Sequence, residues 1–228
     1  MKYISLLLTT LLATSAFAAT FEKTLEHAEK GNVVAQFRLA WIYADGEGVP
    51  KNDALAFKWF RMAADQGDAT AQFNLGVRYV NGRGVPENDA LAVKWFRKAA
   101  DQGDADAQYN LGYMYANGTG VPENDALAVK WYRKAANQGH ASAQYNLGYM
   151  YANGEGVPGD TEIPWFSEEG VPNNNTRAYI WLSMAKTQGN ASAATYIDIL
   201  KPKMTPNQIA QAQALAAKCY ESNYKDCD

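Results

Sequence analysis

The stretch GDADAQYNLGYMYANGTGVPENDALAVKWYRKAANQ, residues 103–138, decides the fold, because nearly the same 36-residue phrase precedes it. Residues 67–102 agree with it at 28 of 36 positions. Copies of the phrase open at Gly31, Gly67, Gly103 and Gly139, each 36 residues after the last. A fixed period of this length is the signature of a repeat protein, in which each unit packs on its neighbours.

Each repeat predicts two helices. If the opening glycine is position 1, the first helix covers positions 2 to 15, with apolar residues at positions 5, 9 and 13. In the second repeat these are Ala71, Leu75 and Tyr79. Asn-Gly ends this helix and a G-x-G-V-P loop follows, because glycine allows the left-handed conformation and proline stops a helix. The second helix, capped by Asn88 or Asp89, buries four side chains: Ala92, Trp95, Phe96 and Ala99.

One helix pair cannot bury its own aromatic residues, so the repeats must stack. The predicted fold class is all-α: an α/α superhelical solenoid of 36-residue helix pairs, between residues 31 and 200. A 14-residue insertion at 159–172 interrupts the fourth repeat, and a partial fifth begins at Gly189. Residues 19–30 predict an N-terminal capping helix, and residues 201–228 predict a C-terminal capping helix with a disulfide-pinned tail.

Residues 1–18 have the pattern of a secretory signal peptide. Lys2 supplies the positive end, Ile4 to Leu12 form a short apolar segment, and Ala16-Phe17-Ala18 is a small-x-small cleavage site. The apolar segment is shorter than the ~20 residues of a membrane-spanning helix. We therefore expect export to the periplasm or beyond the cell, with no membrane-embedded part once mature. The alternative is that the segment stays as an uncleaved anchor.

The two cysteines, Cys219 and Cys227, lie within the last ten residues. In an oxidising compartment such a pair most simply forms a disulfide bond. The alternative is two free or reactive thiols, although no histidine lies nearby in the sequence to activate them.

Composition excludes some classes of function. Lys and Arg number 21 against 24 Asp and Glu, a net charge of −3, which argues against nucleic-acid binding. The two histidines, His27 and His140, are far apart in the repeat order, and we expect both to be solvated. We predict no metal and no cofactor.

The recurring phrase A-x-A-Q-[FY]-x-L-G, followed by G-x-G-V-P and W-[FY]-x-x-A-A, closely resembles the Sel-one-like repeat family. The resemblance implies TPR-like helix pairs in scaffolds that bind other proteins or peptides, often as exported bacterial proteins. Some members act as immunity or inhibitor proteins for secreted toxins. The fourth repeat departs from the pattern at Arg177 and Ile180, so its packing could be irregular.

An enzymatic alternative rests on Ser183 and Lys186, which form an S-x-x-K tetrad. Penicillin-recognising enzymes use such a tetrad, and cysteine-rich relatives in the repeat family are described as penicillin-binding. This chain lacks the accompanying S-D-N and K-T-G motifs and has no cysteine pair within its repeats. We therefore predict a non-enzymatic scaffold, with a cell-wall, penicillin-interacting enzyme as the alternative.

Positions at which near-identical repeats differ are candidates for binding. Positions 4, 8 and 11 share one face of the first helix, and position 12 also varies. The predicted partner-binding residues are Asn74, Asn110, Asn146, Tyr113, Tyr149, Met114 and Met150, with Trp165 and Phe166 of the insertion. Alternatively, the tyrosines and methionines pack between repeats, Trp165 folds back on the scaffold, and basic residues such as Lys94 and Lys130 bind the partner. We expect a monomer.

Overall fold

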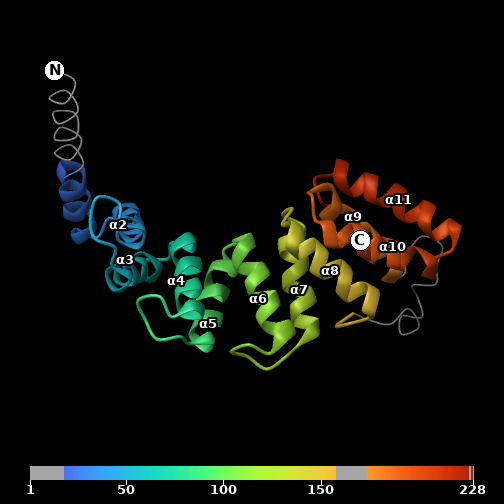
Figure 1. Cartoon of the computed structure of the whole chain (residues 1–228), viewed down its shortest axis with the longest axis horizontal. Helices are drawn as coiled ribbons and strands as arrows, with labels where there is room; N and C mark the ends of the chain where they lie inside the picture. Colours follow the sequence, from blue (N-terminus) through green and yellow to red (C-terminus); the bar gives the residue numbers. More distant parts are fainter. Residues whose placement is uncertain (1–17, 158–173, 226, 228) are drawn as a thin grey trace, which may run out of the picture. The chain divides into compact units, whose positions relative to one another are not determined.

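The computed structural model describes residues 18–157, 174–225 and 227, which divide into two compact units (Figure 1). Unit 1 ends at Gln102, and unit 2 begins at Gly103. Every regular element among these residues is a helix, and consecutive helices pack in pairs, which confirms the predicted α solenoid. Residues 1–17, with most of the predicted signal peptide, and Trp165 and Phe166 lie outside the described residues.

Unit 1 starts with helical residues 18–29. It continues with α2 (Val33–Asp45), α3 (Asp53–Asp65), α4 (Ala69–Asn81) and α5 (Asp89–Asp101). Helix α2 packs on α3, α3 on α4 and α4 on α5. The first helix α4 therefore lies between the second helices α3 and α5.

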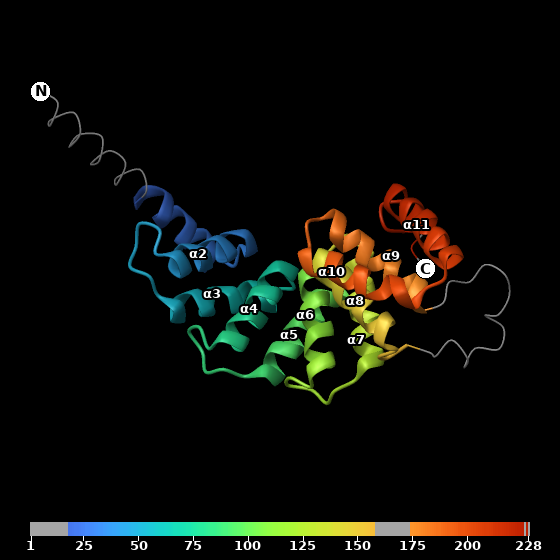
Figure 2. The same ribbon diagram turned by 45° about the vertical axis from the view of Figure 1, so that its right-hand side comes forward.

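Unit 2 continues the pattern and then closes it. Its helices are α6 (Ala105–Asn117), α7 (Asp125–Ala136), α8 (Ala141–Asn153), α9 (Asn174–Thr187), α10 (Ala191–Leu200), the short 3₁₀ helix η1 (Lys201–Lys203) and α11 (Pro206–Glu221). Helix α9 contacts α8, α10 and α11, and both views place α11 beside it (Figures 1 and 2).

Local sequence signals set the helix ends. The side chain of Asn88 accepts a hydrogen bond from the Leu91 N–H and caps α5, and Asp68 caps α4 in the same way. Gly82 ends α4 at φ +62°, a left-handed conformation that favours glycine. The predicted boundaries of the first and second helices therefore agree with the structure to within a residue or two.

The core consists of the predicted apolar stripes. Leu75, Tyr79, Trp95 and Phe96 are all buried. Gly76 allows α4 and α5 to approach closely, because a Cβ atom there would lie 2.7 Å from the Phe96 ring. This close approach explains why position 10 of the repeat is glycine in three first helices.

Helix α9 is buried nearly all round, unlike the second helices before it. Ile180, Trp181 and Leu182, three consecutive residues, are fully buried because α8, α10 and α11 cover different sides of the helix. The departure of Ile180 from the repeat pattern thus fits a helix with more neighbours.

A buried glutamine at position 6 connects successive second helices. The amide of Gln72 donates to the carbonyl of Ala64, near the end of α3, at 3.1 Å. Its side-chain oxygen accepts from Gln102, which follows α5, at 2.8 Å. Equivalent glutamine pairs occur at Gln36 and Gln66, Gln108 and Gln138, and Gln144 and Gln188, with distances of 2.7, 2.8 and 2.7 Å. The carbonyl of Ala64 also accepts from the Gly67 N–H at 3.0 Å, so the glutamine adds a second hydrogen bond to this helix-terminal group.

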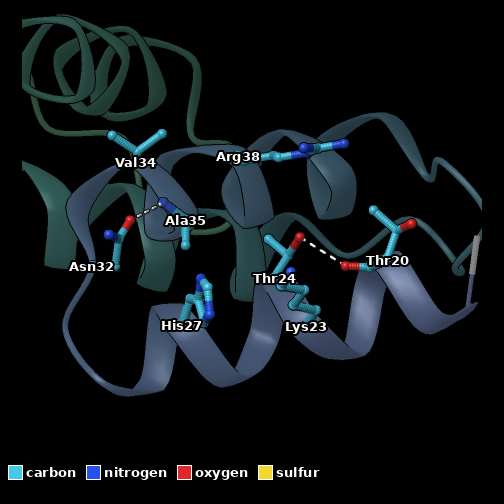
Figure 3. A pocket seen from close by; sticks show the side chains of 8 residues that line it. All are labelled: Thr20, Lys23, Thr24, His27, Asn32, Val34, Ala35 and Arg38. Carbon is cyan, nitrogen blue, oxygen red and sulfur yellow. Dashed lines mark hydrogen bonds between the residues drawn. The ribbon is translucent and has the colours of Figure 1, made fainter.

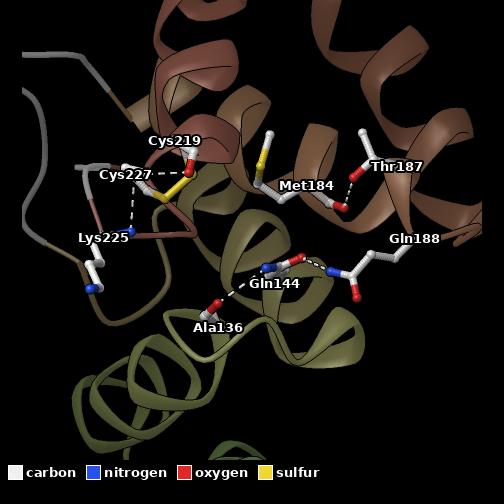
Figure 4. The surroundings of a disulfide bond; sticks show 9 residues. Ala136, Gln144, Met184, Thr187, Gln188, Cys219, Lys225 and Cys227 are labelled. Atoms are coloured by element: carbon white, nitrogen blue, oxygen red, sulfur yellow. Dashed lines mark hydrogen bonds between the residues drawn. A yellow bond between two sulfur atoms is a disulfide. The ribbon is translucent and has the colours of Figure 1, made fainter.

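The C-terminal tail is held by a disulfide bond and by a packing contact. Cys219, in the last turns of α11, is bonded to Cys227, and both are buried (Figure 4). The disulfide predicted from the sequence is therefore present. Between the two cysteines, the ring of Tyr224 packs on Gly139, where an added Cβ would come within 2.9 Å of the ring.

Candidate protein-interaction surface

Position 11 of the repeat leaves large apolar side chains exposed. In unit 2, Tyr113 on α6 is 49% exposed, Tyr149 on α8 is 38% exposed and Ile199 on α10 is 52% exposed. We call these three residues the position-11 row. In unit 1, Trp41 at the same repeat position is 40% exposed. The stripe residues at positions 5, 9 and 13 are buried, so the exposed row lies on a separate face of each first helix.

Tyr149 has an aromatic neighbour from the fifth repeat. Its ring centroid lies 5.3 Å from that of Tyr196 on α10. The Tyr196 hydroxyl donates to the side-chain oxygen of Asn153 at 2.9 Å, which fixes the ring over α8. Partial burial raises the pKa of Tyr196 and the nearby Tyr149 adds to this, so the phenol is neutral at physiological pH.

The three predicted asparagines at position 8 are half-buried and differ in their contacts. Asn74 and Asn110 donate their amides to the carbonyls of Thr70 and Asp106 in their own helices, at 2.8 Å each. The side-chain carbonyl oxygens of these two residues are the groups that a partner's N–H could use. Asn146 instead hydrogen-bonds the hydroxyls of Tyr109 and Tyr132 and so connects α8 with α6 and α7.

Burial raises the pKa of Tyr132 above its usual value near 10, and the hydrogen bond with Asn146 opposes this shift. The pKa of Tyr109 is raised for the same first cause, desolvation. Both phenols therefore stay neutral and act as hydrogen-bonding groups beneath the exposed surface.

His140 is not the solvated residue that we predicted. It caps α8, with its Nδ1 accepting from the Ala143 N–H at 3.1 Å. Its Nε2 lies 3.2 Å from the Asp106 carboxylate, and its ring stacks on Tyr109 at 4.6 Å. The N-cap position holds Asn or Asp in the other repeats, and histidine fulfils the same role here because Nδ1 is also an acceptor.

Met114 and Met150 are each 3% exposed, so the prediction that they bind a partner directly is wrong. In the second repeat, position 12 faces the preceding second helix. Arg78 at this position lies over the Phe60 ring of α3 at 4.9 Å and pairs with Asp53 at 3.2 Å. Ile, Arg and Met at position 12 are all buried, so variation at this position is variation in the packed interior.

The remaining sequence-based candidates contribute no assembled site. Ser183 is half-buried in the middle of α9, and Lys186 is exposed near the helix end. Within residues 18–157 and 174–225, no three His, Cys, Asp or Glu side chains come together as metal ligands. In the same residues, no helix has the length and apolar character to cross a membrane.

Sequence reasoning missed Tyr196 and Ile199. Both lie in the partial repeat that starts at Gly189, where they occupy positions 8 and 11. Counting the 36-residue register through this last repeat would have found them, because the structure places Ile199 at the same exposed position as Tyr113 and Tyr149.

Comparisons with known proteins agree on the family. The Sel1 repeat model matches residues 33–68, 69–104, 105–140, 141–163 and 165–190. A protective antigen of uropathogenic Escherichia coli strains, with an SLR fold, is similar in structure, with a TM-score of 0.73 and 37% sequence identity over 90% of this chain and 41% of that one. A Sel1 repeat protein from Oxalobacter formigenes is 35% identical over 79% of this chain and 48% of that one, with a TM-score of 0.66.

The chain therefore spans less than half the length of each of these two solved proteins. No curated protein matches it. Five consecutive matches to the repeat, together with two related structures above 30% identity, leave one conclusion: the chain belongs to the Sel1 repeat family.

Proposed function

We propose that this protein is an exported, non-enzymatic scaffold that binds a protein or peptide through the position-11 row of unit 2. Sel1 repeats typically serve protein–protein interaction. The observation that carries the proposal is the exposure of Tyr113, Tyr149 and Ile199 at one repeat position. Interface centres are enriched in aromatic residues, and exposed apolar groups in a repeated arrangement offer a partner apolar area to bury.

The polar groups beside the row support the same function. Tyrosine hydroxyls and the side-chain oxygen of Asn110 provide acceptors for the backbone N–H groups of an extended segment. Trp165 and Phe166 of the insertion belong to the proposal on sequence grounds alone. An inhibitor or immunity role toward a secreted toxin is a narrower form of it, supported by the family resemblance, and we propose a monomeric scaffold.

Export is supported by the signal-peptide pattern of residues 1–18 and by the disulfide, which is typical of oxidising compartments. The fold is also that of the protective antigen from Escherichia coli.

Site-specific photo-crosslinking in living cells tests the binding surface. A benzophenone amino acid replaces Tyr113 or Tyr149 in the row, or Lys130 on α7 as a control. We expect Tyr113 and Tyr149 to crosslink to one protein, identified by mass spectrometry, and Lys130 to yield no such product. Equal crosslinking from all three positions, or crosslinking from Lys130 only, would contradict the assignment.

Affinity measurements with the identified partner complete the test. Tyr149→Ala should weaken binding by about 2 kcal/mol, roughly 30-fold, as truncation of an interface anchor does. Tyr113→Ala provides a second variant whose more exposed side chain contributes less to folding. Lys130→Ala should leave affinity unchanged. If calorimetry gives the reverse order, the second helices form the interface.

A further inference from the structure

Unit 1 has a hollow of about 320 Å³ between its N-terminal helix and α2 (Figure 3). The residues that line it are Thr20, Lys23, Thr24, His27, Asn32, Val34, Ala35 and Arg38. None of these eight is acidic, whereas three of them are basic. Lys23 and His27 come from the N-terminal helix, and Arg38 comes from α2 across the hollow.

Arg38 occupies repeat position 8, at which the next three first helices have asparagine. The face that is polar and uncharged in those repeats is therefore cationic in the first one. The start of α2 adds to this charge, because Val34 and Ala35 belong to its first turn and the positive end of the helix dipole lies there.

The acidic residue Glu26 has a basic partner of its own outside the hollow. Glu26, on the N-terminal helix, pairs with Lys30 at 2.5 Å. The pKa of Glu26 is lowered first by that hydrogen bond and charge, and to a lesser extent by His27 and Lys23. The main partner of Glu26 is thus Lys30, which does not line the hollow.

The hollow also has apolar surroundings. Val34 is 74% exposed at its edge, and Trp41 is 40% exposed on the same helix. A carboxylate bound between Lys23, His27 and Arg38 would have room for a neighbouring apolar side chain on Val34. This combination of cationic and apolar groups fits an acidic peptide segment better than a small inorganic anion.

We infer that the hollow between the N-terminal helix and α2 is a second binding site, which takes an acidic segment of a protein partner through Lys23, His27 and Arg38. This site goes beyond the position-11 row of unit 2 and involves different residues. Removal of a signal peptide after Ala18 would place the new α-amino group at Ala19, next to Thr20 of the hollow, and would increase its positive charge.

Titration of the mature, ¹⁵N-labelled protein with short peptides tests this site without knowledge of the partner. The probes are a hexaglutamate peptide with blocked ends, a hexaglutamine peptide of the same length, and inorganic phosphate. Hexaglutamate should shift the amide resonances of Lys23, His27 and Val34 in a saturable, salt-sensitive manner, and hexaglutamine should not.

Arg38→Asn installs the residue that other repeats tolerate at this position, so the fold should persist. It should weaken hexaglutamate binding by about three- to fivefold, the effect of one exposed charge pair. Lys94→Asn removes the same charge from α5, outside the hollow, and should leave the affinity unchanged.

Three results would overturn the inference. They are an absence of shifts at the hollow, equal effects of Arg38→Asn and Lys94→Asn, and saturation by phosphate at lower concentration than by hexaglutamate. Because the titration reads unit 1 and the crosslinking reads unit 2, failure of either proposal leaves the other intact.

Discussion

One buried residue of the core, Tyr132, has a polar group that its counterparts in other repeats lack. Tyr132 on α7 occupies the position of Phe60 and Phe96 in the two preceding second helices, and all three are almost completely buried. The hydroxyl that distinguishes it from phenylalanine meets Asn146. The change from phenylalanine to tyrosine thus comes with a hydrogen-bonding partner on the next first helix, α8.

Tyr132→Phe should make stability less sensitive to alkaline pH. Because burial raises the pKa of Tyr132 in the folded state, the folded protein holds this proton more tightly than the unfolded chain does. The contribution of this proton to the free energy of unfolding is complete below pH ~10, and it is lost as the pH rises above that value. Urea unfolding between pH 7 and pH 11 measures it.

At pH 7 the variant should lose about 1 kcal/mol, the net value of a hydrogen bond. Above pH 10 the difference from the original protein should shrink or reverse. Tyr220→Phe, at an exposed position, is the control. Parallel pH profiles for the original protein and Tyr132→Phe would show that the Tyr132 proton does not contribute.

Among elements, α11 differs from the repeat helices in how it is held. A capping box at Thr205 and Gln208 fixes its start, and the bond between Cys219 and Cys227 fixes its end. Tyr224, within the closed loop, packs on Gly139 just before α8. The tail is therefore held by the covalent bond together with this contact.

Loss of the disulfide should destabilise the protein by roughly 2–3 kcal/mol, as closure of so short a loop predicts. Hydrogen exchange should rise in the last turns of α11 and at Gly139, with α6 unaffected. Replacement of both cysteines by serine and, in parallel, by alanine separates the effects of the bond and of polarity. If thiol titration of the unreduced protein detects two free thiols, the bond does not form in solution.

The ends of the helices and the core stripe could be predicted because their signals are local. Asparagine caps, Asn-Gly ends and apolar periodicity each act within one turn, and the same residues recur in every repeat. The error at Met114 arose because neighbouring positions on a helix differ by about 100° in direction. Position 11 faces outward and position 12 is buried, and variation at both looks the same in the sequence.

The role of His140 and of the glutamine pairs could not be predicted, because each depends on a residue that another part of the chain brings close. Gln102 is 30 residues from Gln72, and His140 is 34 residues from Asp106. Gln72 and Gln102 lie in the same repeat, and His140 and Asp106 lie in adjacent repeats. The apolar period of a single helix carries no signal for either contact.

For the whole molecule, the proposed export has two consequences. Removal of residues 1–18 takes away one lysine, so the net charge changes from −3 to −4. The disulfide also needs an oxidising compartment to persist.

Cleavage after Ala18 should therefore be found in the native host, with Ala19 as the first residue. Intact-mass spectrometry of the periplasmic fraction measures both the new terminus and the loss of two hydrogens in the disulfide. A change of Ala16 and Ala18 to bulky residues should block processing. An intact Met1 on protein from the membrane fraction would show that the segment is kept as an anchor.

The glutamine pair of the fourth repeat has a consequence for how this protein can change in evolution. Gln144 and Gln188 are 44 residues apart, against 30 in the other three pairs, yet their side chains meet at the same distance. The fourteen extra residues between α8 and α9 have therefore left this contact between the two ends of the repeat in place. This connection is a site at which new sequence is inherited at little structural cost, and a foreign epitope grafted there should leave the scaffold folded.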